Sequence, residues 1–173
     1  VYTCSVNKYL SIQSYRDVIE YPTDGLLDVN GWDIRKALQL FQVSNPPLLE
    51  WIKSPIVYYE QTDFRKKLFE LEKDFFSPKT CMFHYLHMAQ GNYRDYLQRS
   101  VVRLKKYFYV LRPIMACQWI EKYNKAPPME FISLVDNLID DAQLNNEITD
   151  LCNRKKSCDE LSEGPAIPVI NSY

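Results

Sequence analysis

Hydrophobic and polar positions alternate in only one part of the chain, its first 30 residues. Residues 16–21 alternate, are rich in β-branched and aromatic side chains, and stop at Pro22 and the turn residues 23–25. A second short run, 26–29, follows that turn at once, so the two runs predict a β-hairpin. A two-stranded hairpin is only marginally stable alone. We therefore expect these strands to complete a larger sheet.

From residue 31 onward, the apolar positions recur with a helical period. Two helices are expected to start where a capping side chain precedes proline, at Asn45-Pro46-Pro47 and at Ser77-Pro78. Gly91-Asn92 predicts a break between two helices, and Pro113 predicts a kink in the second. The predicted helices cover residues 32–44, 46–52, 62–76, 77–90, 93–123, 129–141 and 145–156.

This order of elements predicts an α+β fold, in which the remnant of a small mixed sheet is followed by a mostly α-helical bundle. We expect three parts along the chain. Strands occupy residues 1–30, a helical domain occupies 31–158, and residues 159–173 form a loose tail.

Composition narrows the classes of function. The formal net charge of -1 argues against a wholesale basic surface for duplex nucleic acid, so any anion site must be local. The chain has four glycines and no Walker loop, dinucleotide fingerprint or nucleophile elbow. No apolar run approaches the roughly 20 residues of a membrane span, so no membrane partner is expected. Five cysteines without Cys-x-x-Cys spacing are typical of a reduced, cytoplasmic protein.

Asp28 is the first candidate for chemistry. It lies on the second predicted strand, which runs directly into a helix, and a carboxylate at such a junction can hold a divalent cation or accept a proton. Taken alone, an aspartate beside a turn is more often a helix cap or a solvated side chain. Asp17 and Glu20 on the partner strand are weaker rivals. Asp33 is expected to be a first-turn helix charge.

A second candidate is the stretch 103–113, in which cations and tyrosines are interleaved. At helical spacing Lys105, Tyr109 and Arg112 share a face, and Lys106 lies three residues from Tyr109. This combination suits a triphosphate and a stacked base. The plainer interpretation is a helix with an apolar core face and solvated cations whose stems pack along it. On the residues alone, both interpretations stay open.

His84 and His87 form a third candidate, because histidines three apart share a helix face and can bind a metal. The sequence places no further ligand beside them, and packing or hydrogen bonding within a bundle is the commoner role. A metal-dependent hydrolase centred on this pair is therefore the weakest hypothesis.

Six segments occur in an order and spacing that together are specific, namely 16–22 (RDVIEYP), 28–38 (DVNGWDIRKAL), 44–52 (SNPPLLEWI), 54–58 (SPIVY), 105–113 (KKYFYVLRP) and 127–131 (PPMEF). With these segments the chain resembles the predicted nucleotidyltransferases of the DNA polymerase β-like superfamily that are associated with RNA repair. The resemblance covers about residues 1–138.

The resemblance implies transfer of a nucleoside monophosphate from a nucleoside triphosphate to an acceptor. Such enzymes use two divalent cations, Mg²⁺ or Mn²⁺, held by three carboxylates. By this analogy Asp28 is the third carboxylate, a catalytic residue and metal ligand, and residues 1–30 are the last strands of the nucleotidyltransferase core. The implied nucleotide-binding residues are Lys105, Lys106, Tyr109, Arg112, Lys36 and Asn45, with Arg35 in the same cleft.

The sequence departs from the family pattern in one respect. Members carry a Gly-Ser motif at a helix start and an Asp-x-Asp pair on the next strand, and neither occurs in these 173 residues. We therefore expect a fragment that is inactive alone, because one carboxylate cannot hold two cations. The alternative is a naturally truncated, non-catalytic domain that binds nucleotide, RNA or protein. The acceptor stays open, with RNA among the candidates, and an incomplete sheet with an open edge would favour a homo-oligomer.

Overall fold

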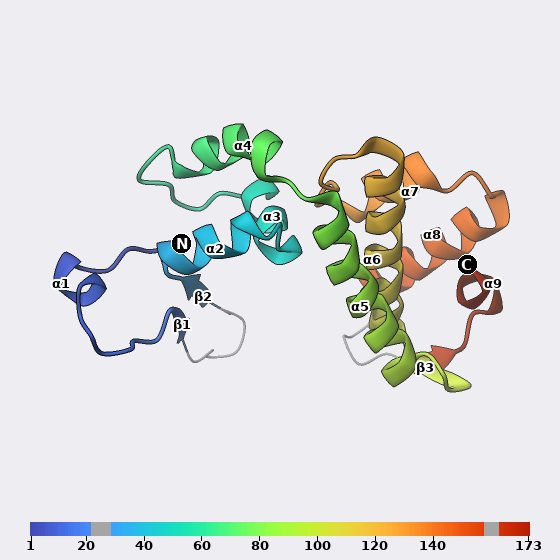
Figure 1. The fold of residues 1–173 in the computed structure, drawn as a ribbon. Coiled ribbons are helices and arrows are strands. Elements are labelled where there is room, and N and C mark those ends of the chain that lie inside the picture. The colour runs from blue at the N-terminus through green and yellow to red at the C-terminus, as the bar shows by residue number, and fades with distance from the viewer. Residues whose placement is uncertain (22–28, 158–162) are drawn as a thin grey trace.

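A computed structural model describes residues 1–21, 29–157 and 163–173. The described chain is mostly helical and contains two antiparallel two-stranded sheets, so the expected α+β fold is confirmed. Figure 1 shows two lobes, with α1 to α4 and the first sheet in one, and α5 to α9 and the second sheet in the other. No described helix has both the length and the apolar character needed to cross a membrane.

The first sheet is the expected hairpin. Strand β1 (Val18–Tyr21) pairs antiparallel with β2 (Val29–Trp32), and Val18 lies opposite Trp32. Tyr2 adds an extended segment on the other side of β2, because its amide donates to the Trp32 carbonyl at 2.9 Å and its carbonyl accepts from the Ile34 amide at 2.8 Å. The sequence predicted that the hairpin completes a larger sheet. Among the described residues, the bridge from Tyr2 is the only addition to the β1–β2 pair. A short helix, α1 (Val6–Tyr9), separates Tyr2 from β1.

Three helices follow the hairpin, and the first two start at a residue whose side chain accepts a hydrogen bond from the first turn. They are α2 (Ile34–Gln42), α3 (Pro46–Lys53) and α4 (Phe64–Phe75). The Asn45 side chain accepts a hydrogen bond from the Leu48 amide at 3.2 Å, as the Asn-Pro-Pro pattern predicts. The rings of Trp32 and Trp51 stack with centroids 4.1 Å apart, and this contact packs α3 against the end of β2.

The second lobe is built on two long helices, α5 (Pro78–Tyr96) and α6 (Leu104–Tyr123). The sequence predicted a break at Gly91-Asn92, and this prediction is wrong: α5 continues through both residues. The Asn92 side chain donates to the Met88 carbonyl at 2.8 Å, so it is satisfied within the helix and does not end it. The chain turns instead after Tyr96 and forms β3 (Val101–Arg103) before α6. Helix α6 contains Pro113, at the position where the sequence predicted a kink.

The described residues from Phe131 onward pack against α6. They form α7 (Phe131–Leu138), α8 (Ala142–Ser157), β4 (Glu163–Pro165) and α9 (Pro168–Ser172). The tail expected to be loose instead contributes β4, which pairs with β3, and two buried side chains, Ile167 and Ile170. The Ile167 amide donates to the Tyr107 hydroxyl at 2.7 Å. Burial of these side chains holds the tail in place.

Helix α6 contributes to two hydrophobic cores. One face supplies Tyr107, Leu111 and Met115 to a core shared with α7, α8 and α9. Another face supplies Ala116, Cys117 and Ile120 to a core shared with α2 to α5. The two lobes are therefore joined through this helix, and the geometry of any site near it depends on both cores.

Candidate functional site

The residue that the resemblance singles out for catalysis, Asp28, lies outside the described residues, in the gap 22–28. Its role as a metal ligand stays a prediction. The described residues around the same hairpin nevertheless form a polar groove at the start of α2, with a cavity volume of about 380 Å³. Its lining comes from the end of α1, the α1–β1 connection, and the N-cap and first turns of α2: Tyr9, Ser11, Ile12, Gln13, Ser14, Tyr15, Asp17, Asp33, Arg35, Lys36 and Gln39.

Asp33 is fully buried in the wall of this groove and caps α2. One carboxylate oxygen accepts from the Arg35 amide and the other from the Tyr9 hydroxyl, each at 2.9 Å. Burial alone would raise the pKa of Asp33, but these hydrogen bonds and one from the Cys4 thiol outweigh it and lower the pKa below its ordinary value. Asp33 is therefore ionised at neutral pH, and both oxygens are committed to holding the fold.

Asp17 is the more accessible carboxylate of the groove. Lys36 Nζ lies 3.1 Å and 3.2 Å from its two oxygens, and 47% of the Asp17 side chain is exposed. The Asp17 backbone carbonyl also accepts from the Asp33 amide at 2.9 Å, which fixes β1 to the start of α2. Next to Lys36, the Arg35 guanidinium lies 5.8 Å from the Tyr9 ring centroid. The groove thus combines a half-exposed carboxylate with two cations on the first turn of a helix, one of which is paired with that carboxylate.

Two of the predicted nucleotide contacts are engaged elsewhere. Asn45 caps α3, as described above. Arg112 forms an ion pair with Glu50 at 3.1 Å and donates to the carbonyls of Met129 and Pro128 at 2.7 Å and 3.3 Å. The buried Tyr85 hydroxyl donates to the same Glu50 oxygen at 2.8 Å. Arg112 therefore joins α3, α5, α6 and the segment before α7.

Lys105, Lys106 and Tyr109 lie on the first turns of α6. Lys106 Nζ is 3.7 Å from the Tyr96 ring centroid and 4.7 Å from that of Tyr109, and Lys105 Nζ is 6.0 Å from Tyr109. None of the three lines the groove at α2. The residues that the resemblance assigned to one nucleotide site are therefore distributed over four places: the groove, the start of α3, the start of α6 and the network around Glu50. Of them, Lys36, with Arg35 beside it, lines the groove.

His84 and His87 are both exposed on α5. Among residues 1–21, 29–157 and 163–173, no group of three or more His, Cys, Asp or Glu side chains is placed to hold a metal ion. The neighbouring thiols of Cys81 and Cys117 are buried, and burial raises the pKa of Cys81 to about 12 and that of Cys117 to about 11. Both are neutral thiols at physiological pH and act as small core residues.

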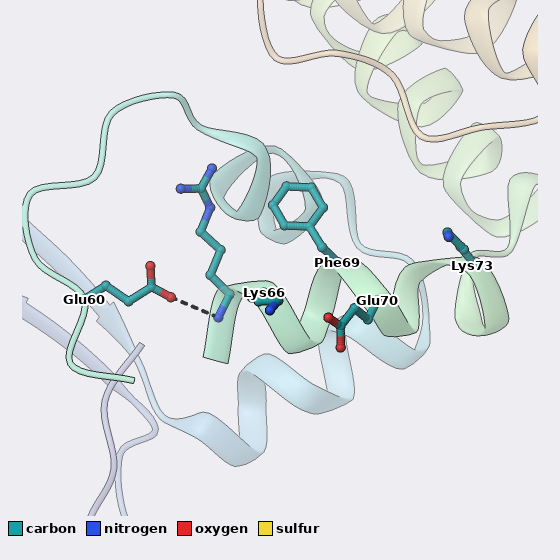
Figure 2. Close-up of a pocket in the computed structure, with 6 residues that line it drawn as sticks. Glu60, Lys66, Phe69, Glu70 and Lys73 are labelled. Carbon is teal, nitrogen blue, oxygen red and sulfur yellow. Dashed lines mark hydrogen bonds between the residues drawn. The ribbon is translucent and has the colours of Figure 1, made fainter. Parts of the chain in front are cut away.

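A second hollow, of about 400 Å³, lies along α4 (Figure 2). Glu60, from the segment before the helix, accepts a hydrogen bond from the Arg65 amide at 3.2 Å. The Arg65 side chain donates to the carbonyls of Ile52 and Ser54, so it ties α4 to the end of α3. Phe69, Glu70, Lys66 and Lys73 line the rest. Its mixed charges and fully engaged arginine do not indicate one class of ligand.

On the sequence alone, Asp17 ranks below Asp28, Tyr9 is not singled out, and Arg35 is placed in the cleft through the family resemblance. The structure places all three in the groove. Asp17 and Lys36 are 19 residues apart, and their pairing depends on how α2 packs on the hairpin. The available signal was the alternation of residues 16–21, which places Asp17 at the start of a strand beside the α2 entry.

Comparison with known proteins finds a matching family model and a similar bacterial protein. The family model RlaP, described as the RNA repair pathway DNA polymerase beta family, matches residues 1–173. The chain is 47% identical over all 173 residues to the uncharacterized protein YcgL of Bacillus subtilis (strain 168). It spans 66% of the length of that relative. No solved structure matches the chain.

Proposed function

The chain belongs to the RNA repair pathway DNA polymerase beta family, and from that membership we propose that the complete protein transfers a nucleoside monophosphate from a nucleoside triphosphate to an acceptor. The observation that carries the proposal is the family match over all 173 residues. An RNA end is the acceptor that the family description favours. The Bacillus subtilis relative is itself uncharacterized, so its similarity supports membership of the family and not a particular activity.

The proposal includes Mg²⁺ or Mn²⁺, which would neutralise the phosphates and activate the acceptor hydroxyl. The described residues taken by themselves do not fit a metal, because no group of three ligating side chains occurs among them. The proposal assigns one ligand to Asp28 and the others to residues beyond these 173, as the greater length of the relative allows.

The role of the described residues in this proposal is to receive the triphosphate at the start of α2. Arg35 and Lys36 project from the first turn of that helix, whose N-terminal end carries a partial positive charge. Together they would balance the negative charge of the phosphates. The carboxylate of Asp17 holds Lys36 at the groove, and the buried Asp33 holds the first turn in position. Asn45 and Arg112 stabilise the fold around this proposed triphosphate site.

The test is a transfer assay on the complete gene product with a labelled nucleoside triphosphate and Mg²⁺. Asp28→Asn should reduce the rate by about 100-fold or more, because it removes a charged ligand at constant shape. Asp24→Asn is the matched control, since it removes a carboxylate four residues earlier, in the predicted turn that precedes the strand of Asp28, and should leave the rate unchanged.

Circular dichroism should show that both variants remain folded. An unchanged rate in Asp28→Asn would contradict the assignment of Asp28. Nucleotide binding without transfer by the complete wild-type protein would contradict the enzymatic proposal and support the non-catalytic alternative.

A further inference from the structure

Three exposed tyrosines and two cations gather where α5 ends and α6 begins. We call this the tyrosine–lysine surface and define it by Tyr93, Tyr96, Arg99, Lys106 and Tyr109. It lies at the lower end of the α5–α6 pair in Figure 1, next to β3, whereas α2 and its groove are in the other lobe. It is therefore distinct from the proposed triphosphate site.

Two of the three tyrosine rings, those of Tyr96 and Tyr109, lie beside Lys106. Its Nζ lies 3.7 Å from the centroid of Tyr96 and 4.7 Å from that of Tyr109. Tyr93 lies three residues before Tyr96 and so shares its side of α5. The exposed fractions of Tyr93, Tyr96 and Tyr109 are 39%, 41% and 40%, and their hydroxyls form no hydrogen bond to any described residue.

Packing does not account for this arrangement. Helix α6 turns Leu104, Tyr107 and Leu111 into the core, and each is at most 4% exposed. Tyr109 and Lys106 lie outside that buried stripe and contribute little to the core. A cation–π contact at an exposed site is weak, and it requires one ring and not the two that lie beside Lys106.

The local charge is opposite to that of the chain as a whole. Residues 93–109 contain five cationic residues and one acidic residue, whereas the formal net charge of the protein is -1. Arg94 is paired with Asp95 at 2.9 Å, and Arg103 with Glu163 at 3.5 Å. Arg99 and Lys106 form no ion pair with any described residue. Lys106 therefore offers a positive charge beside two exposed rings, and Arg99 offers another in the segment between α5 and β3.

We propose that the tyrosine–lysine surface binds a single-stranded nucleic acid. Unpaired bases stack on the rings of Tyr96 and Tyr109, and phosphates of the same strand approach Lys106 and Arg99. Exposed aromatic rings beside cations are the combination that single-strand binding proteins use, because every base has a face to stack and every nucleotide carries a charge. A duplex fits less well, since its base faces are covered by neighbouring pairs.

This inference goes beyond the proposed function, because it concerns where a strand is held and not the transfer of a nucleotide. It also reassigns Lys106 and Tyr109, which the family resemblance had placed at the triphosphate. The two assignments make different predictions for a mononucleotide and for an oligomer, and binding can be measured without turnover.

The test is fluorescence anisotropy on the complete gene product with labelled oligo(U) and oligo(dT) of about 12 nucleotides, at about 50 mM salt. Tyr96→Ala combined with Tyr109→Ala should weaken binding of the strand by at least about tenfold. The matched control is Tyr58→Ala combined with Tyr59→Ala, which removes two rings that are 96% and 80% exposed outside the surface. This control should bind like the wild type.

Two further measurements separate stacking from charge. Tyr96→Phe combined with Tyr109→Phe keeps the rings and should retain the affinity, whereas Lys106→Gln should reduce the slope of log affinity against log salt by about 0.7. Tighter binding of oligo(U) than of oligo(dT) would identify RNA as the strand, and equal affinity would indicate a general single-strand surface.

Four results would overturn the proposal. They are undetectable binding of both oligomers, equal loss of affinity in the Tyr58 and Tyr59 control, unchanged affinity in the Tyr96 and Tyr109 alanine variant, and tight binding of ATP at this surface without binding of an oligomer. If the Tyr96 and Tyr109 alanine variant keeps its affinity and polyglutamate displaces the labelled oligomer completely, the strand is held by charge alone and not by stacking.

Discussion

The groove at α2 and the tyrosine–lysine surface use similar residue types in opposite ways. In the groove, the charged and polar groups satisfy one another: Asp33 accepts from Tyr9 and Arg35, and Asp17 binds Lys36. At the tyrosine–lysine surface, the rings are exposed, and two cations have no acidic partner among the described residues. Side chains that hydrogen-bond to one another are held in fixed positions, as a transfer reaction requires. Side chains without such partners remain able to bind another molecule.

This difference predicts separate consequences for mutation. Changes to the network that joins the lobes, or to the groove, should reduce the free energy of unfolding. Changes to the exposed rings should reduce affinity and leave stability unaltered.

The largest effect on stability is expected for Arg112→Ala. This change leaves the partly buried Glu50 without its cation and frees two carbonyls, so the free energy of unfolding should fall by about 2 kcal/mol. Urea denaturation measures the loss. Lys122→Ala is the control, because Lys122 lies on the same helix as Arg112 but donates to one carbonyl only, that of Asn137 in α7, so its loss should cost much less. A tenfold loss of triphosphate affinity at unchanged stability would instead make Arg112 a phosphate contact.

A smaller loss, of about 1 kcal/mol, is expected for Asp33→Asn, which keeps a capping side chain but removes the charge that strengthens its hydrogen bonds. Because the pKa of Asp33 is lowered from 3.8 by folding, its charge stabilises the protein above that pH, and the contribution is lost as the pH falls through the folded pKa. The difference between wild type and variant should therefore be constant above about pH 5 and shrink at lower pH. A difference that grows on acidification would contradict this account.

Gly91→Ala should stabilise the protein by about 0.5–1 kcal/mol, because Gly91 lies inside α5 and an added Cβ would meet no atom within 4 Å. Thermal unfolding measures the gain. Lower stability would indicate that the helix is interrupted at Gly91-Asn92, as the sequence suggested. Strand affinity should not change, since Gly91 makes no contact with the tyrosine–lysine surface that an added methyl group would alter.

The smallest effect on stability is expected for Asp17→Asn, because ion pairs between partly exposed side chains contribute about 0–1 kcal/mol. Its effect on triphosphate binding should be modest, because Lys36 keeps its charge but loses the partner that orients it. Lys36→Met should weaken triphosphate binding more. Equal triphosphate affinities in both variants and the wild type would remove the groove from the proposed site.

Local chemistry made much of the fold predictable. Asn45 followed by two prolines, and Ser77 followed by Pro78, marked helix starts that the structure confirms, since capping depends on adjacent residues. The pairing of Arg103 with Glu163 in the second sheet joins residues 60 apart, and no local pattern reveals it. Gly91 was misinterpreted because a glycine inside a helix and one at a helix end look alike without the packing around them.

The candidate site was less predictable than the fold. Helical spacing correctly placed Lys106 and Tyr109 together, because both belong to one helix. It did not reveal Tyr96 beside them, which comes from α5, nor Asp17 beside Lys36. Sites assembled from separate elements depend on tertiary packing, and a list of residues from one family pattern does not show which of them meet.

The most direct test of the central claim measures transfer and strand binding on the same two variants of the complete gene product. The account predicts that Asp28→Asn loses transfer by about 100-fold or more but binds oligo(U) like the wild type. It also predicts that the Tyr96 and Tyr109 alanine variant loses strand affinity by at least about tenfold and still transfers nucleotide to a saturating acceptor. If both variants instead lose both properties to the same extent while remaining folded, the two regions form one site, and the account is wrong.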